Sequence, residues 1–461
     1  MSRFPLIFAT ALIASGPGAM ARADAPRVAV GVARVEITPD YPVRLTGYVA
    51  RPVEWEGIEQ RLYARALAVG DDASGPVVLI AVETCALSAD LTGQVAERLR
   101  VGAGLPRERL AVCATHTHTA PALTGVLPFI FGAEVPPEHQ ARIDRYTREL
   151  VDKLERVARA ALADRRPCRL AWGRGRVDFA NNRRTIEDGR WVGFGVNPDA
   201  PVVPTLPVLS ATDDEGRLRA VLTNYACHCT ALDGRDNRVC GDWAGYAGAA
   251  IEGAHPGAFG LIVIGCAGDA NPRVRGSFDA ARDQGESLAR EVDRVLLGPL
   301  APLSGPVEAR SRQISLLFAP LPTRAEWEAK AAAPGKIGLH ARANLARLDR
   351  GERLPTEQPL PVQAWSFGDD LAMVFLGGEV VVDYALRLKR EFDPGRLWIT
   401  AYANDVPCYI ASRRVLAEGG YEVEQSMLSY DRPTRLAPEV EERVIGAVRE
   451  VVPRSFAIPR R

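Results

Sequence analysis

Two of the chain's six histidines, His116 and His118, stand two residues apart in the segment Ala-Thr-His-Thr-His-Thr-Ala-Pro at 114–121. The preceding segment, 110–114, has the length and the small or β-branched composition of a buried strand. Residues two apart on an extended backbone share a face, so His116 and His118 are expected to point into the same cleft. Imidazoles there could bind zinc, move protons or hold developing charge. The pair alone fits ordinary surface or core histidines equally well, because the chain has no His-Glu-x-x-His motif and no paired Cys-x-x-Cys motifs.

Three later segments also carry polar groups at the ends of apolar strand-like runs. Asn224 and His228 end one run, Asp269 and Asn271 follow another through glycines, and Glu379 stands at a strand-to-helix turn. Helix capping or turn formation explains such residues as well as function does, and a helix cap is the alternative for Asp242, which stands at an expected helix start.

The eight cysteines are scattered, and they leave two interpretations open. Cys227-His228-Cys229, with Cys240 nearby, could form a cysteine-rich zinc site. On a strand, however, His228 points away from both neighbouring cysteines, so a single histidine ligand is the better interpretation. One or two disulfides are compatible with an exported protein, and the spacing assigns none.

Composition indicates a large globular protein. The chain has 461 residues, of which 47% are hydrophobic and 25% charged, enough for an extensive core. Lys and Arg number 57 and balance 57 Asp and Glu, so no excess positive charge suggests nucleic acid as a partner. Peripheral membrane contact would have to come from a local apolar surface.

The first 23 residues resemble a secretory signal peptide. Arg3 precedes an apolar run at 4–14, and Ala21-Arg22-Ala23 offers the small residues of a cleavage site. A membrane anchor is the alternative, but the run is too short to span a bilayer. We therefore expect an exported chain, secreted or periplasmic, that begins near Asp24 and has no transmembrane segment in its mature form.

Strand-like and helix-like segments alternate along the chain, which predicts an α/β fold with mixed sheets flanked by helices. The expected strands are 28–37, 77–82, 110–114, 218–226, 260–264, 372–376 and 397–401. The expected helices are 91–100, 139–163, 243–252, 278–297, 380–392 and 438–451. A Pro-rich stretch near 298–322 suggests an internal subdivision.

Taken together, these segments resemble the neutral/alkaline, non-lysosomal ceramidase family, from about Val30 to about Tyr430. The matching pieces, in the family's order, are Gly31 to Thr38, Leu45 to Tyr48, Thr115 to His118, Asn182-Arg183, Asn224 to His228, Gly268 to Pro272, Gly378-Glu379, and Tyr409 with Tyr421. The resemblance implies one large catalytic domain over residues 24–461. It also implies a catalytic Zn²⁺, whose ligands would be His116, His228, Glu379 and Tyr409, with Tyr421 or Tyr402 as alternatives to Tyr409.

The resemblance assigns further roles around the metal. His118 would assist attack or stabilise the oxyanion, and Arg183 with the backbone of Gly47 would line the same pocket. The family's loop carries a serine where this chain has Asn271, and an amide cannot act as a nucleophile. We therefore expect attack by zinc-bound water, with Asn271 donating a hydrogen bond. A further departure is the expected absence of a C-terminal immunoglobulin-like domain.

The resemblance thus implies an exported, zinc-dependent amidohydrolase of N-acyl sphingoid lipids, with a small molecule or lipid as its partner. Two alternatives stay open. One is a zinc hydrolase of a different amide or ester, which Asn271 favours. The other is a zinc-containing binding protein without turnover.

Overall fold

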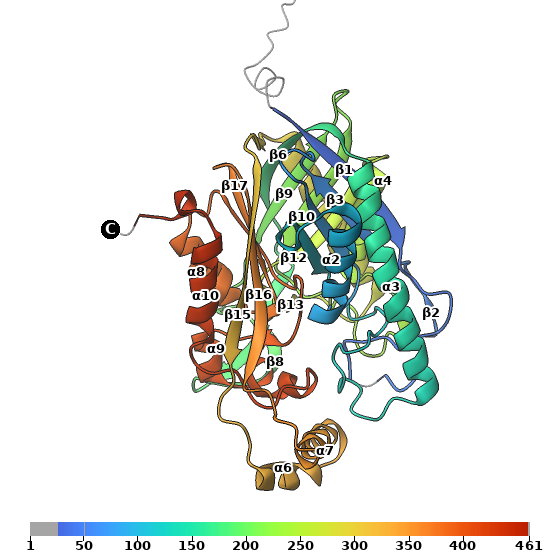
Figure 1. The fold of residues 1–461 in the computed structure, drawn as a ribbon, viewed down its shortest axis with the longest axis vertical. Coiled ribbons are helices and arrows are strands. Elements are labelled where there is room, and N and C mark those ends of the chain that lie inside the picture. The colour runs from blue at the N-terminus through green and yellow to red at the C-terminus, as the bar shows by residue number, and fades with distance from the viewer. Residues whose placement is uncertain (1–25, 50, 460–461) are drawn as a thin grey trace, which may run out of the picture.

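Two β-sheets packed face to face form the centre of the protein in a computed structural model, which describes residues 26–49 and 51–459 (Figure 1). The expected signal peptide lies outside these residues. The order of the first sheet is β12 (Phe259–Ile264), β10 (Leu218–Tyr225), β9 (Thr205–Thr212), β6 (Arg166–Arg176), β1 (Arg27–Glu36), β3 (Tyr63–Val69), β4 (Val77–Val82) and β5 (Leu110–Ala114), with β14 (Ala301–Pro302) paired to β6. The second sheet has the order β15 (Val307–Leu317), β16 (Glu357–Phe367), β17 (Leu371–Leu376) and β19 (Leu397–Thr400).

Strand β4 shows why the first sheet is buried on both faces. All six of its residues are buried. Val77 and Leu79 belong to the apolar cluster between the two sheets, which Trp365 and Phe375 of the second sheet join. Val78 and Ile80 face the opposite way, into the cluster under the helices. Alternation of side chains along the strand therefore divides one apolar run between two cores.

Helices cover the outer faces of both sheets, which gives four layers in the order helix, sheet, sheet, helix (Figure 1). The helices packed against the first sheet are α2 (Ala89–Ala103), α3 (Pro137–Ala163), α4 (Asp242–Ala254) and α5 (Phe278–Leu297). Those against the second sheet are α8 (Val382–Glu391) and α10 (Val440–Val451). The expected α/β class with mixed sheets flanked by helices is confirmed.

Smaller elements connect the layers. Three strands form a separate sheet in the order β13 (Ala270–Pro272), β7 (Ala180–Glu187) and β8 (Arg190–Asn197). Two parallel pairs are β18 (Glu379–Val380) with β20 (Tyr409–Ile410), and β2 (Gly57–Ile58) with β11 (Arg238–Val239). The remaining elements are α9 (Arg413–Glu418), a π-helical turn (Tyr421–Gln425) and 3₁₀ turns at Arg107–Arg109, Ser426–Leu428 and Arg454–Phe456.

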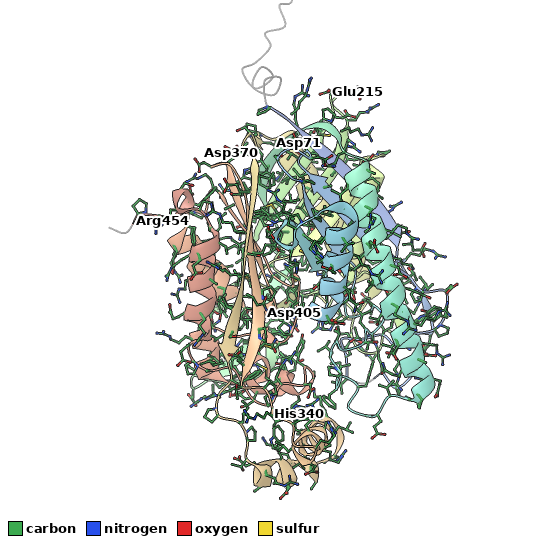
Figure 2. All side chains as sticks on the ribbon, viewed as in Figure 1. Asp71, Glu215, His340, Asp370, Asp405 and Arg454 are labelled. Carbon is green, nitrogen blue, oxygen red and sulfur yellow. The ribbon has the colours of Figure 1, made fainter. Side chains whose placement is uncertain are left out.

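A helical pair, α6 (Arg324–Ala331) and α7 (Gly335–Asp349), projects from one end of the molecule (Figure 1). Trp327 is buried in a small apolar cluster of its own there. The buried His340 lies where the pair meets the body, against Phe129 and 3.5 Å from Asp431 (Figure 2).

The sequence pattern located every strand and helix that it predicted, with shifts of at most a few residues at the ends. It missed β3, β6, β9, β15 and β16, which complete the sheets, and the α6–α7 pair. The 298–322 stretch contains β14 and all of β15 and leads from the first sheet to the second.

All eight cysteines are free and buried. The structure therefore contains none of the disulfides that would be compatible with an exported protein. Among the described residues, no helix combines the length and apolar character needed to cross a bilayer.

Candidate metal centre

The carboxyl ends of strands from both sheets meet at one place, and the loops that leave them carry the polar residues singled out above. His116 lies two residues after β5, and His228 lies three residues after β10. Glu379 begins β18, three residues after β17, and pairs with Tyr409 of β20. Ligand sites in α/β proteins gather at such strand ends, because loops from different strands can converge there.

Three of these side chains point donor atoms at a common space. Oε2 of Glu379 lies 3.1 Å from Nε2 of His116 and 3.1 Å from Nε2 of His228. All three residues are buried, and this carboxylate oxygen has no hydrogen-bond partner. Donors bound to one tetrahedral zinc at about 2.0–2.1 Å lie about 3.3 Å apart. The spacing and the unpartnered oxygen therefore fit a zinc ion.

Hydrogen bonds behind these donors fix their orientation. Nδ1 of His116 donates to the carbonyl of Cys85 (2.6 Å), and Nδ1 of His228 donates to that of Ala267 (2.7 Å). Both Nε2 atoms are thereby left with a lone pair for a cation. The Tyr430 hydroxyl donates to the other oxygen of Glu379.

Of the three tyrosines expected as candidate fourth ligands, Tyr409 is the best placed to complete the set. Its hydroxyl lies 3.2 Å from Nε2 of His228 and accepts a hydrogen bond from Arg183 (3.0 Å). Tyr402 packs against the His116 ring in a tilted arrangement, with centroids 4.4 Å apart, and its hydroxyl has no hydrogen-bond partner. Tyr421 contacts Tyr409 edge to face. The geometry supports Tyr409 as fourth ligand, a role that stays a prediction.

His118 lies next to His116, although not for the reason that the sequence suggested. The expectation of an extended backbone through both histidines is wrong, because β5 ends at Ala114 and His116 has a φ of 62°. The turn nevertheless brings the two Nε2 atoms to 3.1 Å. Gly47 has a φ of 92°, and a Cβ added there would lie 2.5 Å from Cγ of His118. This glycine therefore permits the position of His118.

Arg183 and Asn271 lie together beside the histidines, on adjacent strands β7 and β13. Nη1 of Arg183 is 3.2 Å from Oδ1 of Asn271 and 3.2 Å from Nε2 of His228. Glu422 accepts from Nε of Arg183 (2.9 Å) and also pairs with Arg184. The pKa of Arg183 stays well above its usual range, because Tyr409 and Glu422 outweigh the effect of burial. A permanent cation is thus held beside the three donors.

The pKa shifts of the buried groups place one positive charge, on His116, beside an ionised Glu379. Burial disfavours an ionised Glu379, but the adjacent imidazoles outweigh it and hold its pKa well below the usual range. Burial also opposes a charged His116, and Glu379 reverses this and raises the His116 pKa to about 10. Burial, together with Arg183 and His116, lowers the pKa of His228 to about 3. A proton on His116 supplies the charge that a bound cation would supply in its place.

A comparison with models of protein families gives a match over more than half of the chain. The model of the family described as neutral/alkaline non-lysosomal ceramidase, N-terminal, matches residues 28–287. The chain belongs to this ceramidase family. The match includes His116, His228 and Arg183, and it ends before Glu379 and Tyr409.

Curated relatives are neutral ceramidases. The one from Drosophila pseudoobscura pseudoobscura is 26% identical over 269 residues, 54% of this chain and 36% of the relative. The one from Pseudomonas aeruginosa is 26% identical over 236 residues, 49% of this chain and 34% of the relative. The matched part thus spans about a third of these relatives. The solved structure of the Pseudomonas aeruginosa neutral ceramidase shares the fold, with a TM-score of 0.70 at 19% identity over 95% of this chain and 77% of that one.

Three residues of this ceramidase-family site escaped the sequence reasoning: Cys85, Glu422 and Tyr430. Tyr430 stands 51 residues after its partner Glu379, and Glu422 stands 239 residues after Arg183. No local sequence pattern predicts either contact. Cys85 stands three residues after the apolar run 77–82, where a cysteine is most simply interpreted as a small core residue.

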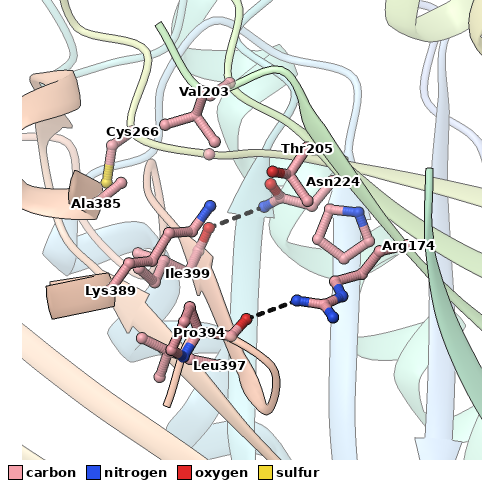
Figure 3. Close-up of a pocket in the computed structure, with 13 residues that line it drawn as sticks. Arg174, Val203, Thr205, Asn224, Cys266, Ala385, Lys389, Pro394, Leu397 and Ile399 are labelled. Carbon is pink, nitrogen blue, oxygen red and sulfur yellow. Dashed lines mark hydrogen bonds between the residues drawn. The ribbon is translucent and has the colours of Figure 1, made fainter. Parts of the chain in front are cut away.

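A separate pocket lies between β9, β10 and α8 (Figure 3). Lys389 and Arg174 approach it from opposite sides, and Arg174 donates to the carbonyl of Pro394 (2.9 Å). Asn224, one of the strand-end residues singled out in the sequence, lines this pocket, whereas none of the expected metal ligands or catalytic residues does. Its walls include Ala226 and Cys266, which lie in the segments that lead to His228 and Asp269.

Proposed function

We propose that this protein is an exported, zinc-dependent amidohydrolase whose substrates are N-acyl sphingoid lipids of the ceramide type. The observation that carries the proposal is the convergence of His116, His228 and Glu379 on one space, with an unpartnered carboxylate oxygen aimed into it. The names of the matched relatives support the substrate class.

In this proposal His116, His228, Glu379 and Tyr409 hold the zinc. The ion, when bound, supplies Lewis-acid chemistry that polarises the scissile amide carbonyl and acidifies water. Two imidazoles, one carboxylate and one phenol are hard or borderline donors, which suit zinc.

His118 is the residue best placed to carry a proton. Burial and the two neighbouring imidazoles lower its pKa well below the usual range, so its resting form is the neutral base. Its Nδ1 has no hydrogen-bond partner, and its ring is the most accessible of the three. A neutral imidazole beside the reacting carbonyl can accept a proton from water and return it to the leaving amine.

Arg183 and Asn271 are placed to hold the oxygen of the scissile amide as it gains charge. The guanidinium stays charged and is fixed by Glu422, so it needs no reorganisation when negative charge develops. The amide of Asn271 can donate a hydrogen bond but cannot act as a nucleophile. Gly47 contributes its backbone N–H in the same proposal.

An apolar strip next to the site supports a lipid substrate. Val192, Phe194 and Val196 stand at alternate positions of β8, and each is about half exposed. Phe194 packs on Tyr421, with centroids 4.9 Å apart, and lies over the Arg183 guanidinium. Exposed apolar side chains that run from a polar site suit a substrate with a polar head and a long alkyl chain.

Metal content and turnover together test the proposal. Purified mature protein should carry about one zinc and release fatty acid from a fluorescent short-chain ceramide, and a chelator should abolish the release. Glu379→Gln should lose both zinc and turnover, whereas the exposed Glu357→Gln should keep both. Sequencing the amino terminus of exported protein should give a start near Asp24.

Other outcomes separate the alternatives. Zinc together with turnover of other amides or esters alone would support the different-substrate hydrolase, which the amide of Asn271 favours. Zinc without turnover of any acyl amide or ester would support a binding protein. Protein that retains no metal after purification in zinc-containing buffer would refute the proposal.

A further inference from the structure

Cys85 lies directly against the histidine pair, in a position that the proposed zinc centre does not use. Its sulfur is 3.9 Å from Nδ1 of His116. Cys85, His116 and His118 each offer a ligand atom, and these three atoms lie within 4.8 Å of one another. They form a second three-donor group, which shares His116 with the group of His116, His228 and Glu379.

The surroundings of Cys85 are those of the site. The thiol is fully buried, yet it interacts electrostatically with Arg51, Tyr421 and Tyr430, three groups that surround the histidines. Cys113, by contrast, lies among apolar residues between the sheets, and burial alone raises its pKa. Nδ1 of His118 is buried and has no hydrogen-bond partner, so this ring has a free nitrogen to offer.

The donor types of the two groups select different metals. A carboxylate with two imidazoles and a phenol suits zinc, whereas a thiolate with imidazoles binds soft ions more strongly. We propose that Cys85, His116 and His118 form a second metal position for soft ions such as Cd²⁺, which competes with the zinc centre for His116. The inhibitory part of this inference rests on the proposed zinc-dependent function.

Sharing one imidazole makes the two positions mutually exclusive. A single Nε2 lone pair cannot bind two ions, and Nδ1 of His116 is already bonded to the Cys85 carbonyl. Binding to the thiol releases its proton to solvent, and the resulting thiolate holds the soft ion. Occupation by Cd²⁺ therefore withdraws His116 from zinc and stops the proposed turnover.

A spectroscopic titration tests the position without reference to turnover. Cd²⁺ is added to full-length protein that a chelator has freed of metal, and ultraviolet absorption is followed for thiolate-to-cadmium charge transfer. Wild type should show a band that saturates at one equivalent, and Cys85→Ser should lose it. Glu379→Gln should keep it, because Glu379 is no part of this group. Cys168→Ser is the matched control, since this buried thiol contacts Arg219 (3.9 Å) and not a histidine, and it should also keep the band.

Two results would overturn the inference: a band that survives Cys85→Ser, or one that Glu379→Gln abolishes. If Cys85→Ser fails to fold by circular dichroism, ¹¹³Cd NMR of wild type decides, because a cadmium shift typical of nitrogen and oxygen ligands alone excludes the thiolate. If ceramide is hydrolysed, the Cd²⁺ concentration for half-inhibition should rise at least about tenfold in Cys85→Ser. Absence of hydrolysis with an intact band pattern would refute only the proposed function.

Discussion

Replacing Gly47 with alanine tests whether the position of His118 is essential. Gly47 has a φ of 92°, and the added Cβ would lie 2.5 Å, 2.6 Å and 2.8 Å from Cγ, Cβ and Cα of His118. The left-handed backbone costs alanine about 1–2 kcal/mol. Overpacking adds about 1–3 kcal/mol. We therefore expect Gly47→Ala to lose about 2–5 kcal/mol of unfolding free energy.

The effect on activity follows from the same distances. Carbon atoms in good contact lie about 3.5–4.0 Å apart, so the His118 ring must retreat by about 1 Å. A misplacement of about 1 Å in a catalytic group costs about 100-fold in rate. We expect the hydrolysis rate of Gly47→Ala to fall by about that factor, with zinc content unchanged because the proposed ligands do not move.

Gly104→Ala is the matched control. Gly104 ends α2 with a φ of 64°, and a Cβ there would meet nothing within 4 Å. It should lose about 1 kcal/mol in urea unfolding and keep full activity. Unfolding curves, zinc content and ceramide hydrolysis are measured on both variants at a temperature where both are folded. If Gly47→Ala hydrolyses substrate as fast as Gly104→Ala, the proposed role of His118 is wrong.

Three further predictions concern the buried polar groups and the metal. Tyr430→Phe leaves an oxygen of Glu379 without its hydrogen-bond donor. We therefore expect the affinity for zinc, measured by competition with a chromogenic chelator, to fall about 10–100-fold. An unchanged affinity would show that this hydrogen bond does not orient the ligand. Removal of zinc by a chelator should lower the melting temperature, because an ion at 100 times its Kd stabilises by about 2.7 kcal/mol; identical melting curves would contradict the centre. Burial raises the pKa of Asp405 (Figure 2) to about 6. As pH rises, this carboxyl loses its proton in the unfolded chain before it does so in the folded protein. The unfolding free energy of Asp405→Asn should therefore rise by up to about 3 kcal/mol relative to wild type between pH 4 and 7. A difference between the two proteins that does not vary with pH would refute this.

The apolar pattern was sufficient for elements whose burial is uniform. No sequence pattern predicts β7 as a strand, because five consecutive residues from Ala180 to Arg184 are buried although four of them are polar. Arg183 and Arg184 can be buried because Glu422, far along the chain, pairs with both. No local periodicity encodes such a pairing, so this strand had to be missed.

The sequence predicted which residues belong to the candidate site but not how they are arranged in space. Segment order and residue type pointed to His116, His228, Glu379 and Arg183, and the fold brings all four together. The positive φ of His116 could not be foreseen, because histidine adopts it only where the surrounding structure compensates the strain. Cys85 and Tyr430 were missed, because Cys85 meets His116 only once β4 has paired with β5, and Tyr430 meets Glu379 from 51 residues along the chain.

The proposed ligands come from loops of both sheets, which has a consequence for the order of assembly. The segment that the family model matches, 28–287, contains His116 and His228 but neither Glu379 nor Tyr409. A chain still emerging from the ribosome at that point can present two imidazoles, which is too few to retain zinc tightly. Under the proposed function, metal uptake is therefore a late event in maturation, since it waits for the slow, long-range docking of the second sheet. A tightly bound ion would therefore indicate that the C-terminal part of the chain, with Glu379 and Tyr409, has docked.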